Sequence, residues 1–477
     1  MAASPTGRDF FETSRAAVDD RELRRKLESA SARHLDHFAQ VKAEFPAYED
    51  EKDAAHRIKT EAIAHLDELL IELTSKLEER GCKVFIAENA VQARDYIVAL
   101  AKSKGARHVV KGKSMTTEEI ELNRAFAKAG IDAVETDLGE YIVQLRGEGP
   151  SHIITPAIHL SKEDIGQLFT DKFGIDYTAE PEKLTAEART RLRSIFLSAE
   201  FGVTGVNFAI AESGTLVVVE NEGNGRLSST MPETFVAVMG IEKVIAKLED
   251  LSHFLEILAR TATGQKLTTY TSFISGPRRE GELDGPGEMH VVILDHGRSA
   301  MLADPVLREA LNCIRCGACL NVCPIYRRIG GHAYRSVYPG PIGSIVCPNL
   351  FGSAAAGHLP FASTLCGACK DICPVKIDIP RILLHLRWKQ SEGKHPLRWP
   401  SAIERARSGA RRFARMARYP RTVRLLGRVA AFVLKPFAHN GYLRRVPGPF
   451  GGWTRYRDFP QPRPRKRRSV APENPAP

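Results

Sequence analysis

The sequence CIRCGACLNVCP, residues 313–324, places four cysteines at spacings of three, three and four residues and ends in a proline. The chain has nine cysteines, and eight of them lie between residues 313 and 373. A Cys-x2-Cys-x2-Cys-x3-Cys-Pro run is typical of proteins with two [4Fe–4S] clusters, in which three cysteines bind one cluster and the fourth binds the other. Paired zinc motifs have longer separations, so the run favours iron–sulfur chemistry over zinc.

A second, shorter run has the same form. In STLCGACKDICP, residues 363–374, three cysteines align with the second, third and fourth cysteines of the first run, and Ser363 stands at the first position. By symmetry, the last cysteine of each run crosses to the other cluster. The pattern therefore predicts two [4Fe–4S] clusters, one held by Cys313, Cys316, Cys319 and Cys373 and the other by Cys323, Cys366 and Cys369.

The second cluster lacks one thiolate in this assignment. Cys347, in the sequence GSIVCPNL, is one candidate for the missing ligand. A hydroxide, Ser363 or a substrate at an open iron is the second alternative, and a three-iron cluster is the third. The ninth cysteine, Cys82, stands in the apolar stretch CKVFIA and is predicted to be a small buried hydrophobic residue.

The rest of the chain predicts an α/β protein with additional helical parts. Residues 1–75 have apolar residues at helical spacings, and residues 76–299 alternate short apolar strands with helices, as in a parallel sheet covered on both faces. Within this region TFVAVMGIEKVI, residues 234–245, predicts a strand followed by a helix. Residues 300–392 hold the cysteines among short helices. Residues 393–477 form a basic C-terminal segment with a Pro/Arg-rich end that is predicted to be disordered.

Charge is distributed unevenly along the 477 residues. The net charge is +11, but from residue 381 onward 24 lysines and arginines stand against four acidic residues, whereas the preceding part carries −9. The segment RRFARMARYPRTVRLLGRVAAFVLKPF, residues 411–437, predicts a basic amphipathic helix for an acidic membrane surface or an acidic protein partner. It lacks the interleaved aromatic residues and the recognisable fold of a nucleic-acid binder, so no nucleic-acid partner is predicted.

The N-terminus is too charged for a secretory signal, and no apolar run reaches the roughly 18 residues of a membrane-spanning helix. These features predict a cytoplasmic protein, with peripheral association at the inner face of the membrane through the basic segment.

Two loops of the α/β region have the composition of ligand-binding loops. Lys111, Lys113 and Ser114 precede a predicted helix, an arrangement that favours an anion. Residues 223–226, with the sequence GNGR, follow a strand, and glycines there allow backbone amides to face a carboxylate or phosphate. Each loop is equally compatible with a solvated turn in front of a capped helix. Dinucleotide-binding and P-loop motifs are absent from the sequence.

Other side chains of the chemically active types show weaker patterns. His152, His290 and His332 have no metal-ligand spacing and are predicted to be structural. A nucleophile with an adjacent base does not stand out, although Glu212 and Glu220 are candidates for acid–base chemistry.

Several separate stretches together resemble the lactate-utilisation protein B family, whose members are iron–sulfur proteins with a LUD domain. The resemblance runs from about residue 60 to 400, and the late WTRYRDFP also fits. It is carried by VVKGKSMTTEEIELN (109–123), AESGTLVVVENEGNGRLSSTMPETFVAVMGIEKVI (211–245), CIRCGACLNVCPIYRRIGGHAY (313–334) and GPIGS (340–344).

The resemblance implies a NagB/RpiA-like doubly wound LUD domain followed by an α-helical ferredoxin-like domain. It implies two partners, an iron–sulfur subunit with CCG-type domains and a smaller LUD-domain subunit, acting together to oxidise L-lactate to pyruvate. The family's cluster ligands fall on the seven cysteines assigned above, and a serine at position 363 is compatible with the family pattern.

Two functions follow from these features. The first is an electron-transfer subunit of an oxidoreductase complex that oxidises L-lactate. The second is a LUD domain with its own acyl- or sugar-phosphate-type chemistry, in which the clusters are only structural. Reduction of the clusters by an electron donor separates the two, because a relay must change oxidation state and a structural cluster need not.

Overall fold

The structure is a computed structural model that describes residues 7–391, 401–444 and 458–461. It divides into two compact units, Met1–Arg398 and Trp399–Pro477. The first unit begins with four helices, as the helical spacing of the N-terminal residues predicts. These are α1 (Gly7–Asp19), α2 (Arg21–Ala43), α3 (Tyr48–Ala64) and α4 (Leu66–Glu79). The Asp20 side chain caps α2 by accepting a hydrogen bond from the backbone N–H of Leu23 at 2.9 Å.

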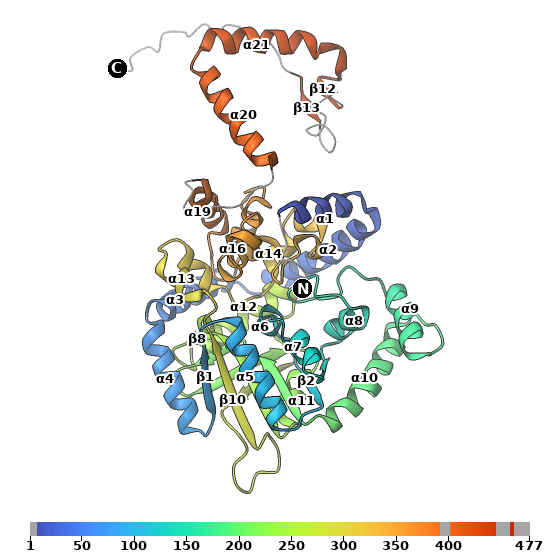
Figure 1. Cartoon of the computed structure of the whole chain (residues 1–477), viewed down its shortest axis with the longest axis vertical. Helices are drawn as coiled ribbons and strands as arrows, with labels where there is room; N and C mark the ends of the chain where they lie inside the picture. Colours follow the sequence, from blue (N-terminus) through green and yellow to red (C-terminus); the bar gives the residue numbers. More distant parts are fainter. Residues whose placement is uncertain (1–6, 392–400, 445–457, 462–477) are drawn as a thin grey trace. The chain divides into compact units, whose positions relative to one another are not determined.

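A six-stranded parallel sheet lies at the centre of the first unit (Figure 1). Its strands run in the order β1 (Lys83–Ala87), β10 (Glu288–Leu294), β7 (Thr234–Gly240), β4 (Phe201–Gly205), β2 (His108–Lys111) and β3 (Asp132–Glu135). The central strand β7 is buried along its whole length, which explains its continuous apolar sequence.

Helices cover both faces of this sheet. On one face α5 (Ala90–Ser103) and α7 (Leu122–Lys128) bury Ile97 and Phe126 against the strands. On the other face the strands share a large apolar core with α3, α4 and a second sheet. The doubly wound α/β fold predicted from the sequence is confirmed. The remaining helices of this region are α6 (Met115–Glu119), α8 (Leu138–Arg146), α9 (Lys162–Phe173), α10 (Pro181–Ser198), α11 (Asn224–Thr230) and α12 (Leu251–Thr263).

The second sheet has four strands in the order β8 (Val244–Ile245), β5 (Phe208–Ile210), β6 (Thr215–Glu220) and β9 (Tyr270–Ile274). Strands β5 and β6 are antiparallel and are joined at Gly214, whose φ of +62° favours glycine. The prediction of a helix after β7 is wrong, because a single 3₁₀ turn, η1 (Ile241–Lys243), leads directly into β8. The chain turns there because β8 pairs with β5 in the second sheet.

The regular elements of the cysteine-containing region are all α- or 3₁₀-helices, most of them short, as predicted for a ferredoxin-like domain. Its elements are α13 (Arg298–Ala303), η2 (Leu307–Asn312), α14 (Ala318–Asn321), α15 (Tyr326–Ile329), η3 (His332–Tyr334), α16 (Gly340–Leu350), α17 (Ser353–Ala356), η4 (Leu359–Phe361), α18 (Ala368–Asp371) and α19 (Ile379–Ser391). Its apolar residues belong to the same buried cluster as those of the α/β region. The two regions therefore share one continuous core.

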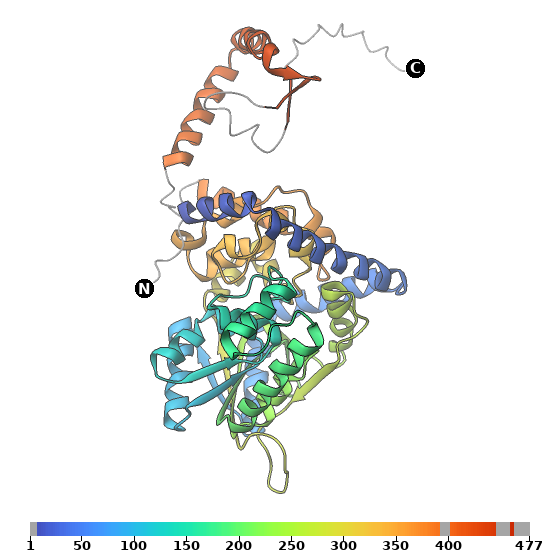
Figure 2. The ribbon, with the colours of Figure 1, turned by 90° about the vertical axis from the view of Figure 1, so that its right-hand side faces the viewer.

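The N-terminal helices pack against the cysteine-containing region, although they are about 300 residues away in sequence. Helix α1 contacts η3, and α2 contacts α14 and α15 (Figure 2). At this junction the Tyr326 hydroxyl donates a hydrogen bond to the backbone oxygen of Ser151 at 2.8 Å. A Cβ atom at Gly331 would collide with the same oxygen, so the close approach requires glycine.

The second unit contains two helices, α20 (Ser401–Ala417) and α21 (Pro420–Val433). A 3₁₀ turn η5 (Lys435–Phe437) and the short strands β11 (Ala438–His439), β12 (Tyr442–Leu443) and β13 (Phe459–Pro460) follow. The predicted basic helix is thus two helices that meet at Pro420. The predicted disordered end and most of the WTRYRDFP motif lie outside the described residues. Within the described parts of the chain, no helix is long and apolar enough to cross a membrane.

Candidate iron–sulfur site

The two cysteine runs adopt the same local fold, fifty residues apart. The short helices α14 and α18 begin at Ala318 and Ala368, and each follows a glycine in the left-handed region, with φ of +73° at Gly317 and +91° at Gly367. The third residue of each run, Arg315 or Leu365, also has positive φ, +62° and +57°. The sequence repeat is therefore a structural repeat.

The first group of thiols comes from α14, from the residues just before it and from Cys373, which follows α18. Burial raises the pKa of the Cys316 thiol, and the neighbouring thiols of Cys373 and Cys313 raise it further. Burial also raises the pKa of Cys319, to which Cys316 and Cys313 contribute. These electrostatic effects connect Cys313, Cys316, Cys319 and Cys373. These cysteines are the four residues that spacing predicts as the ligands of one cluster, and their ligation of iron stays a prediction.

The second group contains Cys323, Cys366 and Cys369. Burial raises the pKa of Cys369 to about 12, and the thiols of Cys323 and Cys366 add to the shift. The two groups adjoin, because α14, which contains Cys319, contacts α18, which contains Cys369. Three neighbouring thiols in this group and four in the other match the sets predicted from the sequence; as ligand sets they remain predictions.

The surroundings of the sulfurs fit iron–sulfur clusters. Backbone N–H groups donate hydrogen bonds to three of them: Arg315 to Cys313 at 3.4 Å, Tyr326 to Cys323 at 3.5 Å and Ile377 to Cys373 at 3.4 Å. Such donors offset the negative charge of a thiolate-bound cluster. Burial raises the pKa of the thiols of Cys316, Cys319, Cys323, Cys369 and Cys373, and binding to a metal favours the thiolate form of such thiols.

The two groups differ in their access to solvent. Cys316, Cys319 and Cys373 of the first group are buried. Cys366 of the second group is exposed, and a hydrogen bond from the Thr364 side chain lowers the pKa of its thiol. The second group is therefore the one that reaches the molecular surface.

Cys347 makes hydrogen bonds to residues outside both groups. It is fully buried in α16, where its sulfur accepts a hydrogen bond from the Ser336 hydroxyl at 2.9 Å and donates to the Tyr338 carbonyl at 3.5 Å. Burial raises the pKa of this thiol to about 11. These contacts make Cys347 a poor candidate for the missing ligand.

Buried cations surround the first group of thiols at Cys313. Burial lowers the pKa of Lys59 to about 8 and that of Lys243 to about 8, while the nearby Cys313 thiol opposes both shifts. The Arg315 guanidinium lies over the Tyr338 ring, 4.7 Å from its centroid, and contacts Glu242 at 3.4 Å. Three cations beside one cysteine are suited to an anionic cluster.

A buried ion network continues from these cations into the α/β region. The Arg298 guanidinium donates to both oxygens of Glu119, at 2.8 and 2.9 Å, and to Glu242 at 2.6 Å. Burial would raise the pKa of Glu242, but Arg298, Arg315 and Lys243 outweigh it and hold the pKa at about 2. The sequence does not reveal this network, because directly bonded partners such as Arg298 and Glu119 are 179 residues apart.

The lysines of the first predicted loop are already paired. Lys111 is completely buried and contacts Glu135 at 2.5 Å and Glu118 at 3.4 Å. Lys113 donates to the Ile154 carbonyl at 2.5 Å and lies 3.5 Å from Asp137. The loop therefore does not offer the free cations that an anion site requires, and the hypothesis of an anion site there is not supported.

The glycine loop at residues 223–226 binds a carboxylate, as its composition suggests, but this carboxylate is the side chain of Glu220 in the same chain. The backbone N–H groups of Gly225 and Arg226 donate to the two oxygens of Glu220, at 2.6 and 2.7 Å. Glu212 likewise accepts from the backbone N–H of Leu248 at 2.7 Å. Both candidate acid–base glutamates thus fix loop geometry in this structure.

Two of the three histidines that were predicted to be structural have contacts of that kind. The buried His152 accepts hydrogen bonds through Nδ1 from the backbone N–H groups of Ile154 and Thr155, at 3.0 and 3.2 Å. His290 contacts the Tyr96 hydroxyl at 2.7 Å.

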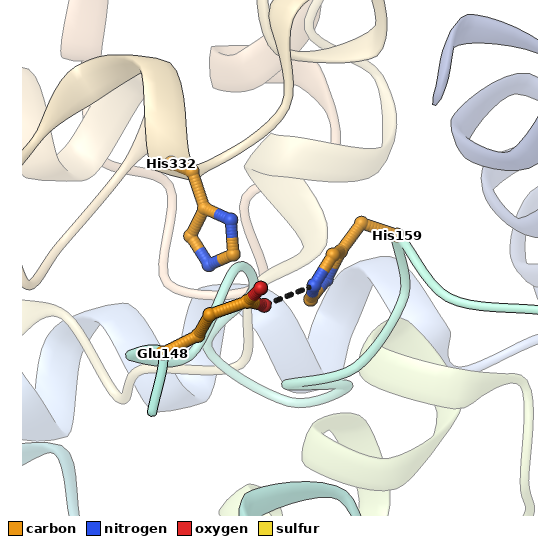
Figure 3. Close-up of side chains that lie close together, drawn as sticks. All are labelled: Glu148, His159 and His332. Atoms are coloured by element: carbon orange, nitrogen blue, oxygen red, sulfur yellow. Dashed lines mark hydrogen bonds and ion pairs between the residues drawn. The ribbon is translucent and has the colours of Figure 1, made fainter. Parts of the chain in front are cut away.

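The third histidine, His332, belongs to a polar junction that the sequence did not reveal (Figure 3). Glu148, His159 and His332 each place one potential ligand atom within 4.8 Å of the other two, and His159 is 2.9 Å from Glu148. The Arg146 guanidinium pairs with the same carboxylate at 3.0 Å, and His332 Nε2 contacts the Gly149 carbonyl at 2.8 Å. These contacts join the loop after α8 to η3.

Comparison with protein families agrees with this two-part organisation. Residues 70–294 match the LUD domain, and residues 309–377 match a 4Fe-4S dicluster domain. A crystal structure of a DUF162 family protein from Deinococcus radiodurans matches with 16% identity and a TM-score of 0.28, covering 48% of this chain and 98% of that chain. An α/β LUD domain joined to a helical domain with paired cysteine runs defines an iron–sulfur protein of the LUD-domain class.

Relatives of nearly the same length narrow this class to one family. Lactate utilization protein B of Oceanobacillus iheyensis is 43% identical over 447 residues, covering 93% of this chain and 92% of the relative. The proteins of the same name from Shouchella clausii and Anoxybacillus flavithermus are 41% and 40% identical, with coverage of 96–97% of each chain. The chain therefore belongs to the lactate utilization protein B family.

Proposed function

We propose that this chain is the electron-transfer subunit of a complex that oxidises L-lactate to pyruvate. The relatives' name supports a role in lactate utilisation. The observation that supports the electron-transfer role is the structural repeat of the two cysteine runs, whose helices α14 and α18 are in contact and whose second run reaches the surface at Cys366.

In this proposal Cys313, Cys316, Cys319 and Cys373 hold one [4Fe–4S] cluster, and Cys323, Cys366 and Cys369 hold three irons of a second. When bound, such clusters supply one-electron transfer at low potential. The residues around them determine the environment of each. Lys59, Lys243 and Arg315 offset negative charge at the first group, whereas the Thr364 side chain, a backbone N–H and exposure to solvent do so at Cys366.

The exposed position of Cys366 gives the relay a direction. The first group is buried against the LUD domain, and the second meets solvent. A partner that exchanges electrons with this chain would therefore dock over Cys366. We propose the CCG-domain iron–sulfur subunit and the smaller LUD-domain subunit as the partners of the complex, without a nucleic acid.

We also propose that the second unit binds the acidic inner face of the membrane, which places the cytoplasmic complex beside it. Its helices expose arginines together with large apolar side chains. The apolar side chains are Phe413, Tyr419, Leu425, Leu426, Val429, Phe432, Val433 and Phe437. The exposed arginines are Arg411, Arg412, Arg415, Arg418, Arg421, Arg424 and Arg428. This combination is typical of helices that lie in a membrane interface.

The test is anaerobic purification followed by electron paramagnetic resonance, with iron and sulfide analysis. The chain alone should contain iron and sulfide and give a reduced-cluster signal with dithionite. In the assembled complex, L-lactate should produce the same signal. A colourless or zinc-containing chain would contradict the iron–sulfur assignment. Iron–sulfur clusters that never change oxidation state with lactate and both partners would contradict the relay and favour structural clusters.

A further inference from the structure

The repeat of the two cysteine runs has one mismatch, which is at the first ligand position. Cys313 begins the first run, and Ser363 stands exactly fifty residues later at the start of the second. The backbone around the two positions is the same, since the residue two places further on has positive φ in both runs, +62° at Arg315 and +57° at Leu365. The serine therefore lies at a position built like that of a ligand.

The side-chain atoms at these positions make the same hydrogen bond. The Arg315 N–H donates to Cys313 Sγ at 3.4 Å, and the Leu365 N–H donates to Ser363 Oγ at 3.1 Å. The glycine after the next cysteine of each run matches as well, because both glycines have left-handed backbone, with φ of +73° at Gly317 and +91° at Gly367. Ser363 Oγ thus has the orientation within its run that Cys313 Sγ has in the other.

The position of Ser363 is also fixed from outside the run. The Arg387 guanidinium on α19 donates to the Ser363 carbonyl at 3.1 Å and to the Pro360 carbonyl at 2.9 Å. Ser363 is half-buried, next to the exposed Thr364 and Cys366 on the surface side of the second group. The alternative thiol, Cys347, is held by Ser336 and Tyr338 instead.

We infer that Ser363 Oγ is the fourth protein ligand of the cluster held by Cys323, Cys366 and Cys369. This inference rests on the proposed function, since it requires the two clusters. One Fe–O bond forms as the hydroxyl loses its proton to solvent, and the oxidation states of the irons do not change in this step. An alkoxide is a harder donor than a thiolate and favours ferric iron. The second cluster then has one iron that differs from the other three.

The experiment uses the full chain, prepared anaerobically with ⁵⁷Fe, as wild type and as the Ser363→Cys and Ser363→Ala variants. Mössbauer spectroscopy should resolve one oxygen-bound iron in the wild type. Ser363→Cys should replace that site by a fourth thiolate-bound site and raise the midpoint potential of this cluster. Ser363→Ala should lose iron from this cluster and show a three-iron signal in electron paramagnetic resonance after oxidation. Ser353→Ala, which removes a half-buried serine hydroxyl at the start of α17 in the same domain, is the matched control and should match the wild type.

A distinct iron site that persists in Ser363→Cys would overturn the inference, as would a wild-type spectrum with no such site. Loss of the same iron in Cys347→Ser would assign the ligand to Cys347 instead. These failures differ from failure of the proposed function, in which the wild-type chain would contain zinc or no iron at all.

Discussion

Replacement of Arg298 by methionine tests whether buried charges join the cysteine-containing region to the LUD domain. Arg298 is 1% exposed and lies in α13, and its guanidinium contacts Glu119 and Glu242, whose side chains are 0% and 2% exposed. Methionine keeps the apolar part of the side chain and removes the charge. Glu119 and Glu242 then remain buried without the positive charge of Arg298 beside them.

Removing one partner of a buried ion pair costs about 3–5 kcal/mol, because the remaining charge is left without compensation. Glu242 retains Arg315 at 3.4 Å, whereas Glu119 retains the Tyr338 hydroxyl at 2.9 Å. Most of the cost therefore arises at Glu119. A second substitution, Glu119→Gln, should recover at least about 1 kcal/mol of it, since a neutral amide needs no counter-charge.

Native-state hydrogen exchange of the amides in the buried strand β7 measures the free energy of opening without complete loss of the clusters. A cost of about 3 kcal/mol should speed exchange more than a hundredfold. The control is Lys76→Met, which breaks a pair with Glu79 at 2.9 Å whose side chains are 39% and 56% exposed, and it should cost less than about 1 kcal/mol. If exchange in Arg298→Met lies within a few-fold of exchange in this control, the network does not hold the two regions together.

Three further substitutions test other parts of the molecule. Lys243→Met removes a buried cation near Cys313 and should lower the midpoint potential of the first cluster by on the order of tens of millivolts, as measured by redox titration; an unchanged potential would contradict a role for this charge. Leu425→Ser combined with Phe432→Ser removes side chains that are 61% and 80% exposed, so binding to anionic vesicles should fall about a hundredfold, which corresponds to about 3 kcal/mol. Leu283→Ser, at a side chain that is 92% exposed on the loop before β10, is the control, and equal vesicle binding by both variants would refute the membrane proposal. Gly331→Ala forces a Cβ atom against the loop after α8 and should lower the thermal midpoint by several degrees; a wild-type midpoint would show that this contact is not needed.

The sequence predicts the parts of this structure that depend on local spacing. Cysteines three and four residues apart indicate a cluster whatever the rest of the chain does, and the alternation of strands and helices indicates a parallel sheet. The correspondence between Ser363 and Cys313 is also evident from the sequence, because each residue stands three positions before the next cysteine of its run.

The sequence does not predict contacts whose partners come from other elements. From the sequence, Lys111 resembles a free phosphate-binding lysine. In the structure it is paired, because the neighbouring strand β3 places Glu135 at 2.5 Å from it. Glu220 likewise resembles a catalytic carboxylate in the sequence, but in the structure it accepts a hydrogen bond from the backbone of the glycine loop. Short stretches give an additional error, since residues 241–245 have a helical composition but form the turn and strand that the second sheet requires.

The two thiol groups solve the same electrostatic problem in different ways. A cluster with thiolate ligands is anionic, and burying an anion costs free energy unless nearby charges compensate it. The group that contains Cys313 has Lys59, Lys243 and Arg315 for this purpose, whereas the group that contains Cys366 depends on its exposure to water. A partner that covers Cys366 removes this water and must supply donors or cations of its own, so docking should shift the potential of the second cluster and leave that of the first nearly unchanged. If the proposed relay operates, electron exchange at this surface is then coupled to docking of the proposed partner.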